Sequence, residues 1–106
     1  MIRKYLEDMQ IAVTEAATGK AALSRLAESV PDLICLDLML PESSGYAICE
    51  HVRKTASLRE VPVLVISARQ MPADRAAAEE VGANAYLIKP IRRAQFEATI
   101  RELLAL

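Results

Sequence analysis

The sequence predicts an α/β domain built on an open parallel sheet that helices cover on both faces. Short apolar runs alternate along the chain with segments whose apolar residues recur every three or four positions. Such runs are typical of strands buried on both faces, and the longer period is typical of amphipathic helices. With 106 residues and 53% apolar content, the chain suffices for one core. We therefore expect residues 1–106 to form a single domain.

Four apolar runs are the predicted strands, and each is about the length of a buried strand. They span residues 11–17, 33–40, 61–66 and 85–88. Because parallel neighbours need a crossover between them, a helix is expected in each interval. The alternation therefore predicts an open α/β sheet.

Helix signals lie between and around these runs. Thr18 and Ser44 have side chains that can cap helix N-termini, and Gly82 suits the left-handed position after a helix over residues 72–81. Apolar spacing predicts two more helices, over residues 1–9 and 92–104. The predicted order is α-β-α-β-α-β-α-β-α, so the sheet has no strand before its first helix.

Charge and cysteine usage narrow the class of partner and the compartment. A formal net charge of −1 gives no electrostatic reason to expect binding to nucleic acid or to an anionic membrane. Cys35 and Cys49 fit neither a metal-ligand spacing nor a disulfide scaffold, and both are predicted to be small core residues. Without a signal peptide or a long apolar run, we expect a cytoplasmic location.

Three polar residues follow predicted strands at the point where each strand ends. Asp37 lies in the run "LICLDLML", Ser67 follows "VLVI", and Lys89 follows "AYLI". Because functional residues gather at the carboxyl ends of strands in open α/β sheets, we expect these side chains to meet. A carboxylate with an ammonium countercharge and a hydroxyl donor suits the handling of an anion, with Asp37 as nucleophile.

The segments "PDLICLDLMLPESSGY", "VPVLVISAR" and "GANAYLIKPI" closely resemble the hallmark segments of response-regulator receiver domains of two-component signalling. The resemblance covers nearly the whole chain. It implies the CheY-like, flavodoxin-like fold. It also implies a domain that accepts a phosphoryl group from a histidine kinase or a histidine phosphotransfer protein and then changes its partner-binding surface.

The resemblance also assigns roles to single residues. Asp37 matches the phospho-accepting aspartate, Ser67 the hydroxyl residue that contacts the phosphoryl group, and Lys89 the lysine that pairs with it. Tyr86 matches the aromatic switch residue, which rotates as Ser67 moves. Lys89 and Pro90 match the family's cis peptide bond.

The loop after the aspartate matches the family as well. Pro41 and Gly45 correspond to its turn, where Gly45 relieves crowding, and Ser44 replaces a more usual acidic cap. Outward residues of the last two helices and the strand between them form the usual partner surface of receivers. The candidates for it are Arg75, Arg92, Arg93 and Glu97.

The resemblance implies a Mg²⁺ site that this chain only partly supplies. In receivers the metal is held by an acidic pair before the first helix, by the phospho-accepting aspartate, here Asp37, and by a backbone carbonyl, here that of Met39. The acidic pair is absent from the sequence. Glu7, Asp8 and Glu42 are the nearest acids, and we expect none of them to replace it.

The first strand of the family is absent together with that pair. In the family it lies between the strands that correspond here to residues 11–17 and 33–40. Its loss therefore leaves backbone N–H and C=O groups along the facing edges of both strands that need hydrogen-bond partners. Residues 11–17 could close up against residues 33–37, two chains could pair edges or exchange elements as a homodimer, or the natural start could lie upstream. We favour a shortened sequence over an evolved loss and expect self-association in either case.

Two other functions compete with the phospho-acceptor. The first is a phosphorylation-independent receiver that serves as an interaction or dimerisation module because its metal site is incomplete. The second is an aspartate-nucleophile phosphatase. That class needs a second aspartate two positions after the first, where this chain has Met39, so it is disfavoured. The domain itself is expected not to be an enzyme beyond catalysing its own phosphorylation and dephosphorylation.

Overall fold

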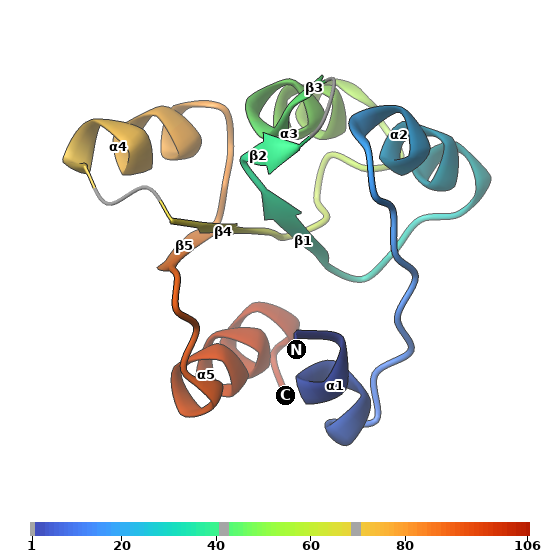
Figure 1. Cartoon of the computed structure of the whole chain (residues 1–106). Coiled ribbons are helices and arrows are strands. Elements are labelled where there is room, and N and C mark those ends of the chain that lie inside the picture. The colour runs from blue at the N-terminus through green and yellow to red at the C-terminus, as the bar shows by residue number, and fades with distance from the viewer. Residues whose placement is uncertain (1, 41–42, 69–70) are drawn as a thin grey trace.

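The chain folds into a three-stranded parallel sheet between two layers of helices (Figure 1). The computed structural model describes residues 2–40, 43–68 and 71–106, with the backbone alone at residues 39–40 and 43–44. Its helices are α1 (Ile2–Asp8), α2 (Gly19–Glu28), α3 (Gly45–Lys54), α4 (Pro72–Glu80) and α5 (Arg93–Leu104). The strands of the sheet are β1 (Ile34–Asp37), β4 (Val63–Ser67) and β5 (Ala85–Ile88).

The sheet has the order β1-β4-β5, and both of its pairings are parallel. Ile34 lies opposite Val63 and Leu64 opposite Ala85, so the three strands run in register towards one edge. This arrangement confirms the predicted α/β fold with a parallel sheet. All three carboxyl ends therefore lie at the same edge.

Side chains alternate between the two faces of the sheet, as strands buried on both faces require. One face packs against α2, α3 and α4, and the other packs against α1 and α5 (Figure 1). Within β4, Val63 and Val65 belong to the first core and Leu64 and Ile66 to the second, and each is at most 2% exposed. The central strand is therefore buried throughout, which explains its unbroken apolar run.

The helices begin and end close to the predicted positions. The Thr18 hydroxyl accepts a hydrogen bond from the backbone N–H of Ala21 at 3.1 Å and so caps α2. Gly82 follows α4 with φ 103°, in the left-handed region that glycine favours. The cap predicted for Ser44 stays a prediction, because the side chain of this residue lies outside the described atoms.

The run over residues 33–40 forms two elements instead of one strand. β1 ends at Asp37, and after Leu38 the chain enters β2 (Met39–Leu40), which pairs antiparallel with β3 (Ser43–Ser44). The backbone N–H of Gly45 donates to the carbonyl of Leu38 at 3.3 Å and ties the start of α3 to this bend. Pro41 and Glu42, also singled out in the sequence, lie outside the described residues.

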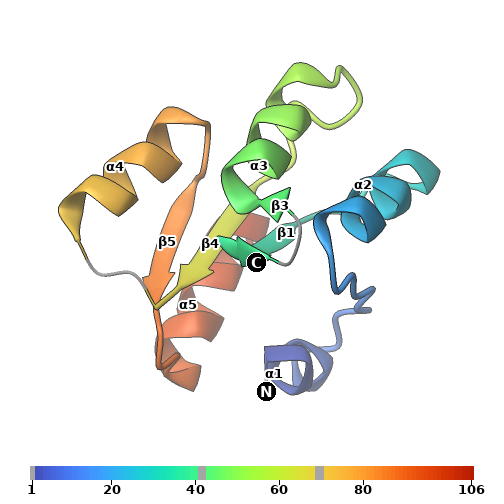
Figure 2. The ribbon, with the colours of Figure 1, turned by 45° about the horizontal axis from the view of Figure 1, so that its top comes forward.

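The strand predicted over residues 11–17 is wrong. Residues 11–16 form no regular element, and residues 17–18 form a bend before α2. Figure 2 shows this extended segment connecting α1 to α2, apart from the sheet. A strand needs a hydrogen-bonded neighbour, and a cleft separates this segment from β1. The proposed closure of residues 11–17 onto residues 33–37 is therefore also absent.

Candidate functional site

The centre of the candidate site is an ion pair between the ends of two strands that are not adjacent in the sheet. The Nζ atom of Lys89, directly after β5, donates to Oδ2 of Asp37, the last residue of β1, at 2.8 Å. The Lys89 side chain is 44% exposed and that of Asp37 is 34% exposed. Both charged groups are therefore open to a ligand from solvent.

Ser67 lies between them as the last residue of the central strand. It is fully buried, pairs with Ile88, and its backbone carbonyl accepts a hydrogen bond from the N–H of Lys89 at 2.8 Å. The three residues predicted to meet thus lie at the carboxyl ends of three neighbouring strands, with Asp37 and Ser67 as last residues and Lys89 directly after β5. The structure confirms the predicted cis peptide bond between Lys89 and Pro90.

Gly45 presses against the backbone of the aspartate. A Cβ atom added to Gly45 would lie 2.8 Å from the carbonyl oxygen of Asp37 and 2.8 Å from Cα of Leu38. Real side chains do not tolerate such approaches to backbone atoms. The crowding predicted at this turn is present, and the absence of a side chain at Gly45 lets α3 begin directly beside Asp37.

Tyr86, the predicted switch residue, lies within the core in this structure. Its side chain is 6% exposed and packs in the core that faces α3. It comes from β5, three residues before Lys89, and pairs in register with Val65 of the central strand. The aromatic ring therefore lies on the α3 side of the sheet, below the edge that carries the ion pair.

The acids near the chain start do not reach Asp37. Glu7 accepts a hydrogen bond from Arg3 at 3.2 Å, and Asp8 accepts one from Arg93 at 2.9 Å. Arg93 also donates to Glu97 at 3.1 Å, and its guanidinium carbon lies 5.2 Å from the ring centroid of Tyr5. These contacts join α1 to α5, on the opposite face of the sheet from α4.

The same contacts bear on the predicted partner surface. Arg93 pairs with Asp8 of α1 and with Glu97 of its own helix. Arg75 forms an exposed ion pair with Glu79 at 3.7 Å, and Arg92 is exposed just before α5. Arg75, Arg92, Arg93 and Glu97 all stay predicted members of that surface.

The residues of the site do not form a magnesium site on their own. Hard divalent cations take six or more oxygen ligands, usually with several carboxylates or with water. Among the residues that the structure describes, no three acids, histidines or cysteines gather closely enough to hold a metal ion. Asp37 itself is paired with Lys89. The donor set therefore does not fit the family's metal.

One feature of this region escaped the sequence prediction. Cys49 is buried as predicted, at 1% exposed, and its thiol lies 3.2 Å from the carbonyl of Val81. Cys35, in contrast, has an exposed side chain that lines the cleft beside β1, so its prediction as a core residue is wrong. Its apolar neighbours in the sequence predict burial, but which strand edge it lies on depends on the order of the strands in the sheet.

The fold is an α/β structure whose parallel sheet carries a paired aspartate and lysine at its carboxyl edge. A family model described as the response regulator receiver domain matches residues 1–101. The chain therefore belongs to the response regulator receiver domain family, which acts in two-component phosphorelay signalling.

Relatives and solved structures agree with this family. The chain is 36% identical to ycf27 of Guillardia theta, a protein named as a probable transcriptional regulator; the match covers 97% of the chain and 41% of the relative. The chain is also similar to the crystal structure of a protein from Chloroflexus aurantiacus that is described as a response regulator. The match covers the whole of this chain and 87% of that protein's chain, with a TM-score of 0.95 and 30% identity.

A further similar structure is the receiver domain of the sensor histidine kinase PA1611 from Pseudomonas aeruginosa. The match covers 99% of this chain and 86% of that domain's chain, with a TM-score of 0.89 and 28% identity. That structure has a magnesium ion in its active-site cleft. The chain spans about two fifths of the length of the curated relatives that it matches first. Within its described residues, no helix has both the length and the hydropathy needed to span a bilayer.

Proposed function

We propose that this domain accepts a phosphoryl group on Asp37 and transmits the change to a partner protein. The observation that carries the proposal is the 2.8 Å pair between Asp37 and Lys89 at the open edge of the sheet. A carboxylate is a competent nucleophile towards phosphorus, and a fixed ammonium balances the charge that accumulates on the transferred group. Ser67, between the two, offers a hydroxyl to the same group.

The proposed donor is a phosphohistidine of a histidine kinase or of a histidine phosphotransfer protein. A carboxylate oxygen of Asp37 attacks the phosphorus atom, a P–O bond forms, and the P–N bond to the imidazole breaks. The electron pair of that bond stays on the imidazole nitrogen, which takes a proton from water. The product is an aspartyl phosphate whose oxygens lie within reach of the Lys89 ammonium.

Phosphorylation of Asp37 adds negative charge at the closely packed carboxyl edge of the sheet. Two negative charges on Asp37 attract Lys89 and the Ser67 hydroxyl, and a shift of Ser67 changes the space beside β5 into which Tyr86 packs. The surface of α4, β5 and α5, with Arg75, Arg92, Arg93 and Glu97, is the proposed place where a partner binds differently after this change. The domain modifies itself and turns over no separate substrate, and we place the reaction in the cytoplasm.

A phosphorylation-independent interaction module is the second candidate. It is favoured by the lack of a three-ligand metal group among the described residues. In most enzymes that transfer phosphoryl groups, metal ions neutralise the negative charge of the transferred group. The Lys89 ammonium supplies one positive charge for this purpose. In this second function the receiver fold would serve as a fixed binding surface.

The two functions are separated by treating the chain with a small phosphodonor and measuring the intact mass, with and without Mg²⁺. Asp37→Asn removes the proposed nucleophile and keeps the size of the side chain. Asp32→Asn is the matched control, because Asp32 precedes the amino end of the same strand. One added phosphoryl group in the native chain and in Asp32→Asn, but not in Asp37→Asn, supports the phospho-acceptor. No addition in either buffer supports the interaction module.

A further inference from the structure

Three polar side chains on one face of α3 donate hydrogen bonds to α4 and to the residues directly after it. From the amino end of α3 they are Tyr46, Cys49 and Arg53. Their acceptors are the backbone carbonyls of Asp74 at 3.4 Å, Val81 at 3.2 Å and Gly82 at 2.7 Å. Because the donors are spaced by three and four positions, they lie on one face of the helix. α3 and α4 are therefore joined along their length by polar contacts.

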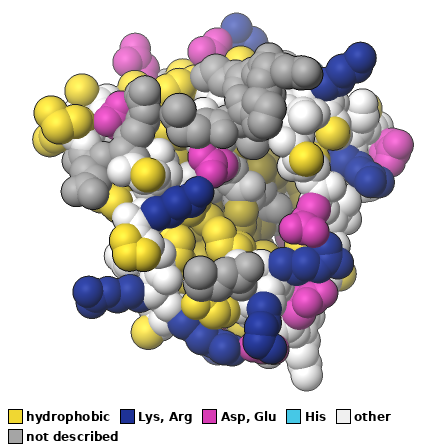
Figure 3. Space-filling model, in the orientation of Figure 1, with side chains coloured by type: hydrophobic (Ala, Val, Ile, Leu, Met, Phe, Trp, Pro, Cys, Tyr) yellow, Lys and Arg dark blue, Asp and Glu magenta, His cyan; other side chains and the backbone are white. Residues whose placement is uncertain are grey.

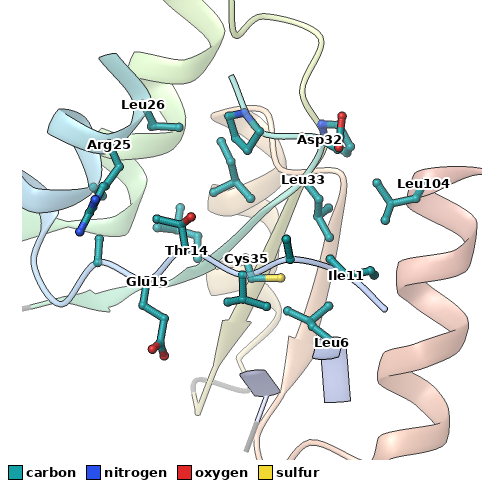
Figure 4. A pocket seen from close by; sticks show the side chains of 18 of the residues that line it. Leu6, Ile11, Thr14, Glu15, Arg25, Leu26, Asp32, Leu33, Cys35 and Leu104 are labelled. Carbon is teal, nitrogen blue, oxygen red and sulfur yellow. The ribbon is translucent and has the colours of Figure 1, made fainter. Parts of the chain in front are cut away.

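Another face of α3 is apolar and is directed away from α4. In the space-filling view, hydrophobic side chains gather in a hollow near the centre of the face that Figure 1 presents (Figure 3). Ile48 of α3 lines the cleft beside β1, where Figure 4 shows Leu26 of α2 together with Leu33 and Cys35. Since α3 lies between α2 and α4 in Figures 1 and 2, the polar face and the cleft are separate. The bonds to α4 do not involve the cleft.

α4 is held more firmly at its carboxyl end than at its amino end. Met71 precedes the helix without a side-chain cap bond, and Ala78 is the one buried residue among the nine of the helix. Ala78 and Val81 pack in the same core, and both lie at the carboxyl end. A helix this short is marginal without tertiary contacts. Two of the three bonds from α3 also reach the carboxyl end, whereas the bond from Tyr46 reaches the first turn.

Tyr46 directly follows Gly45, whose position depends on the aspartate. The N–H of Gly45 donates to the carbonyl of Leu38 at 3.3 Å, and a Cβ atom on Gly45 would lie 2.8 Å from the carbonyl oxygen of Asp37. A displacement of this turn therefore displaces the first turn of α3, and Tyr46 with it. The bond to Asp74 is long, at 3.4 Å where hydroxyl donors usually lie at about 2.8 Å, so a small shift breaks it.

We propose that Tyr46 is a positioning residue that holds the amino end of α4 and releases it when the turn between Asp37 and Gly45 shifts. The proposal rests on the proposed function for the event that shifts the turn, which is phosphorylation of Asp37. The carboxyl end of α4 stays packed, so the amino half of the helix opens while the rest keeps its place. This connection runs along α3 and is separate from the one through Ser67 and Tyr86.

Tyr46→Phe removes the hydroxyl and keeps the ring, and amide hydrogen exchange of the full chain measures the effect. Residues 74–77 should exchange about threefold to fivefold faster, because one hydrogen bond is lost, while residues 81–83 keep the native rate. Tyr5→Phe is the matched control, since it removes a hydroxyl on the other face of the sheet and should change neither rate. Native exchange of residues 74–77 in Tyr46→Phe, or an equal rise at residues 81–83, would overturn the proposal.

Gly45→Ala tests the connection without any phosphoryl group. Its Cβ meets the backbone of Asp37, so the start of α3 must shift, and exchange at residues 74–77 should rise relative to exchange at residues 81–83. Adding Tyr46→Phe to Gly45→Ala should raise it by less than about twofold more, because both changes break the same bond. Effects that multiply would mean that the turn acts on α4 without Tyr46, against the proposal. If Gly45→Ala fails to fold, phosphorylation supplies the displacement instead.

Treatment with a small phosphodonor completes the test, and the intact mass of each sample gives the uptake. Tyr46→Phe should take up as much as the native chain. Phosphorylation should raise exchange at residues 74–77 of the native chain about threefold, to the rate of Tyr46→Phe, and should leave that variant unchanged. An equal response in both chains would overturn the role of Tyr46. A native chain without uptake would overturn the phospho-acceptor on Asp37 instead, and the Gly45→Ala pair would still decide whether Tyr46 connects the turn to α4.

Discussion

Lys89 and Asp37 are 52 positions apart in the sequence, yet the ammonium of one donates to the carboxylate of the other at 2.8 Å. The contact exists because β1, β4 and β5 are parallel and in register, which brings their carboxyl ends to one edge. Ser67 ends the strand between them. The geometry of this edge therefore follows from the order of the strands, and the proposed chemistry follows from the edge.

Lys89→Ala is expected to lower phosphoryl uptake by at least about tenfold, because the transferred group loses its fixed positive charge. The free energy of unfolding should change by less than about 1 kcal/mol, since the pair is partly exposed and screened by water. Lys89→Arg keeps the charge and should retain more uptake than the alanine variant. Uptake in Lys89→Ala equal to that of the native chain would remove the lysine from the proposed site.

Gly45→Ala is expected to lower both stability and phosphoryl uptake. The added Cβ meets the carbonyl oxygen of Asp37 and Cα of Leu38 at 2.8 Å, so the end of β1 must move, at a cost of about 1–3 kcal/mol. Gly82→Ala is the matched control, because its Cβ meets the Arg53 side chain and its φ is 103°. That variant should lose stability but keep uptake per folded molecule. Equal uptake in both variants would argue against the role of Gly45 beside Asp37.

Arg53→Ala is expected to destabilise the fold by about 2–3 kcal/mol, since hydrogen bonds from a charged group are strong when partly buried. The guanidinium donates to the carbonyls of Gly82, Val61 and Arg59 and to the side-chain oxygen of Asn84, at 2.7–3.0 Å. It thereby joins α3 to the loops before β4 and β5. Chemical denaturation measures the loss, and Arg53→Lys should recover only part of it. A loss below about 0.5 kcal/mol would contradict this role.

The reactivity of Cys35 should depend on pH in an unusual range. Desolvation by the surrounding protein raises the pKa of its thiol from 9.0 to about 11, although the side chain can be reached from the cleft. In a Cys49→Ala background, the alkylation rate should keep rising up to about pH 11, because the thiolate is the reactive form. A plateau near pH 9 would mean that the thiol is freely solvated.

The same shift has a consequence for stability. Because the pKa of Cys35 is raised in the folded chain, the neutral thiol is favoured there, and its contribution is fully present below about pH 9 and lost as the pH rises towards about 11. The free energy of unfolding of the native chain should therefore fall over this window more than that of Cys35→Ser. Parallel pH profiles for the two chains would contradict the shift.

Most of the fold could be predicted from the sequence because its signals are local. The apolar run before Ser67 is buried on both faces, Thr18 caps α2 through its own hydroxyl, and Gly82 has the left-handed conformation that its position after a helix requires. Asp37, Ser67 and Lys89 could be placed together because the carboxyl ends of parallel strands meet.

The predictions that failed depend on how segments far apart in the sequence pack against one another. Residues 11–17 have the composition of a strand, but a strand exists only when another pairs with it, and the cleft separates them from β1. The prediction that Cys35 is buried fails for the same reason, because no strand pairs with the cleft side of β1 among the described residues. The contact of Arg93 with Asp8 depends on how α1 packs against α5 and has no signature in the sequence, and the place of Arg93 and Glu97 on the partner surface stays a prediction.

The central claim is that Asp37 itself receives the phosphoryl group. The most direct measurement is fragmentation mass spectrometry of the tryptic peptide 26–53 after treatment of the native chain with a small phosphodonor. We expect one phosphoryl group located on Asp37, and none on that peptide from Asp37→Asn. A phosphoryl group on any other acid of the peptide, or a native peptide that stays unmodified at saturating donor, would contradict it.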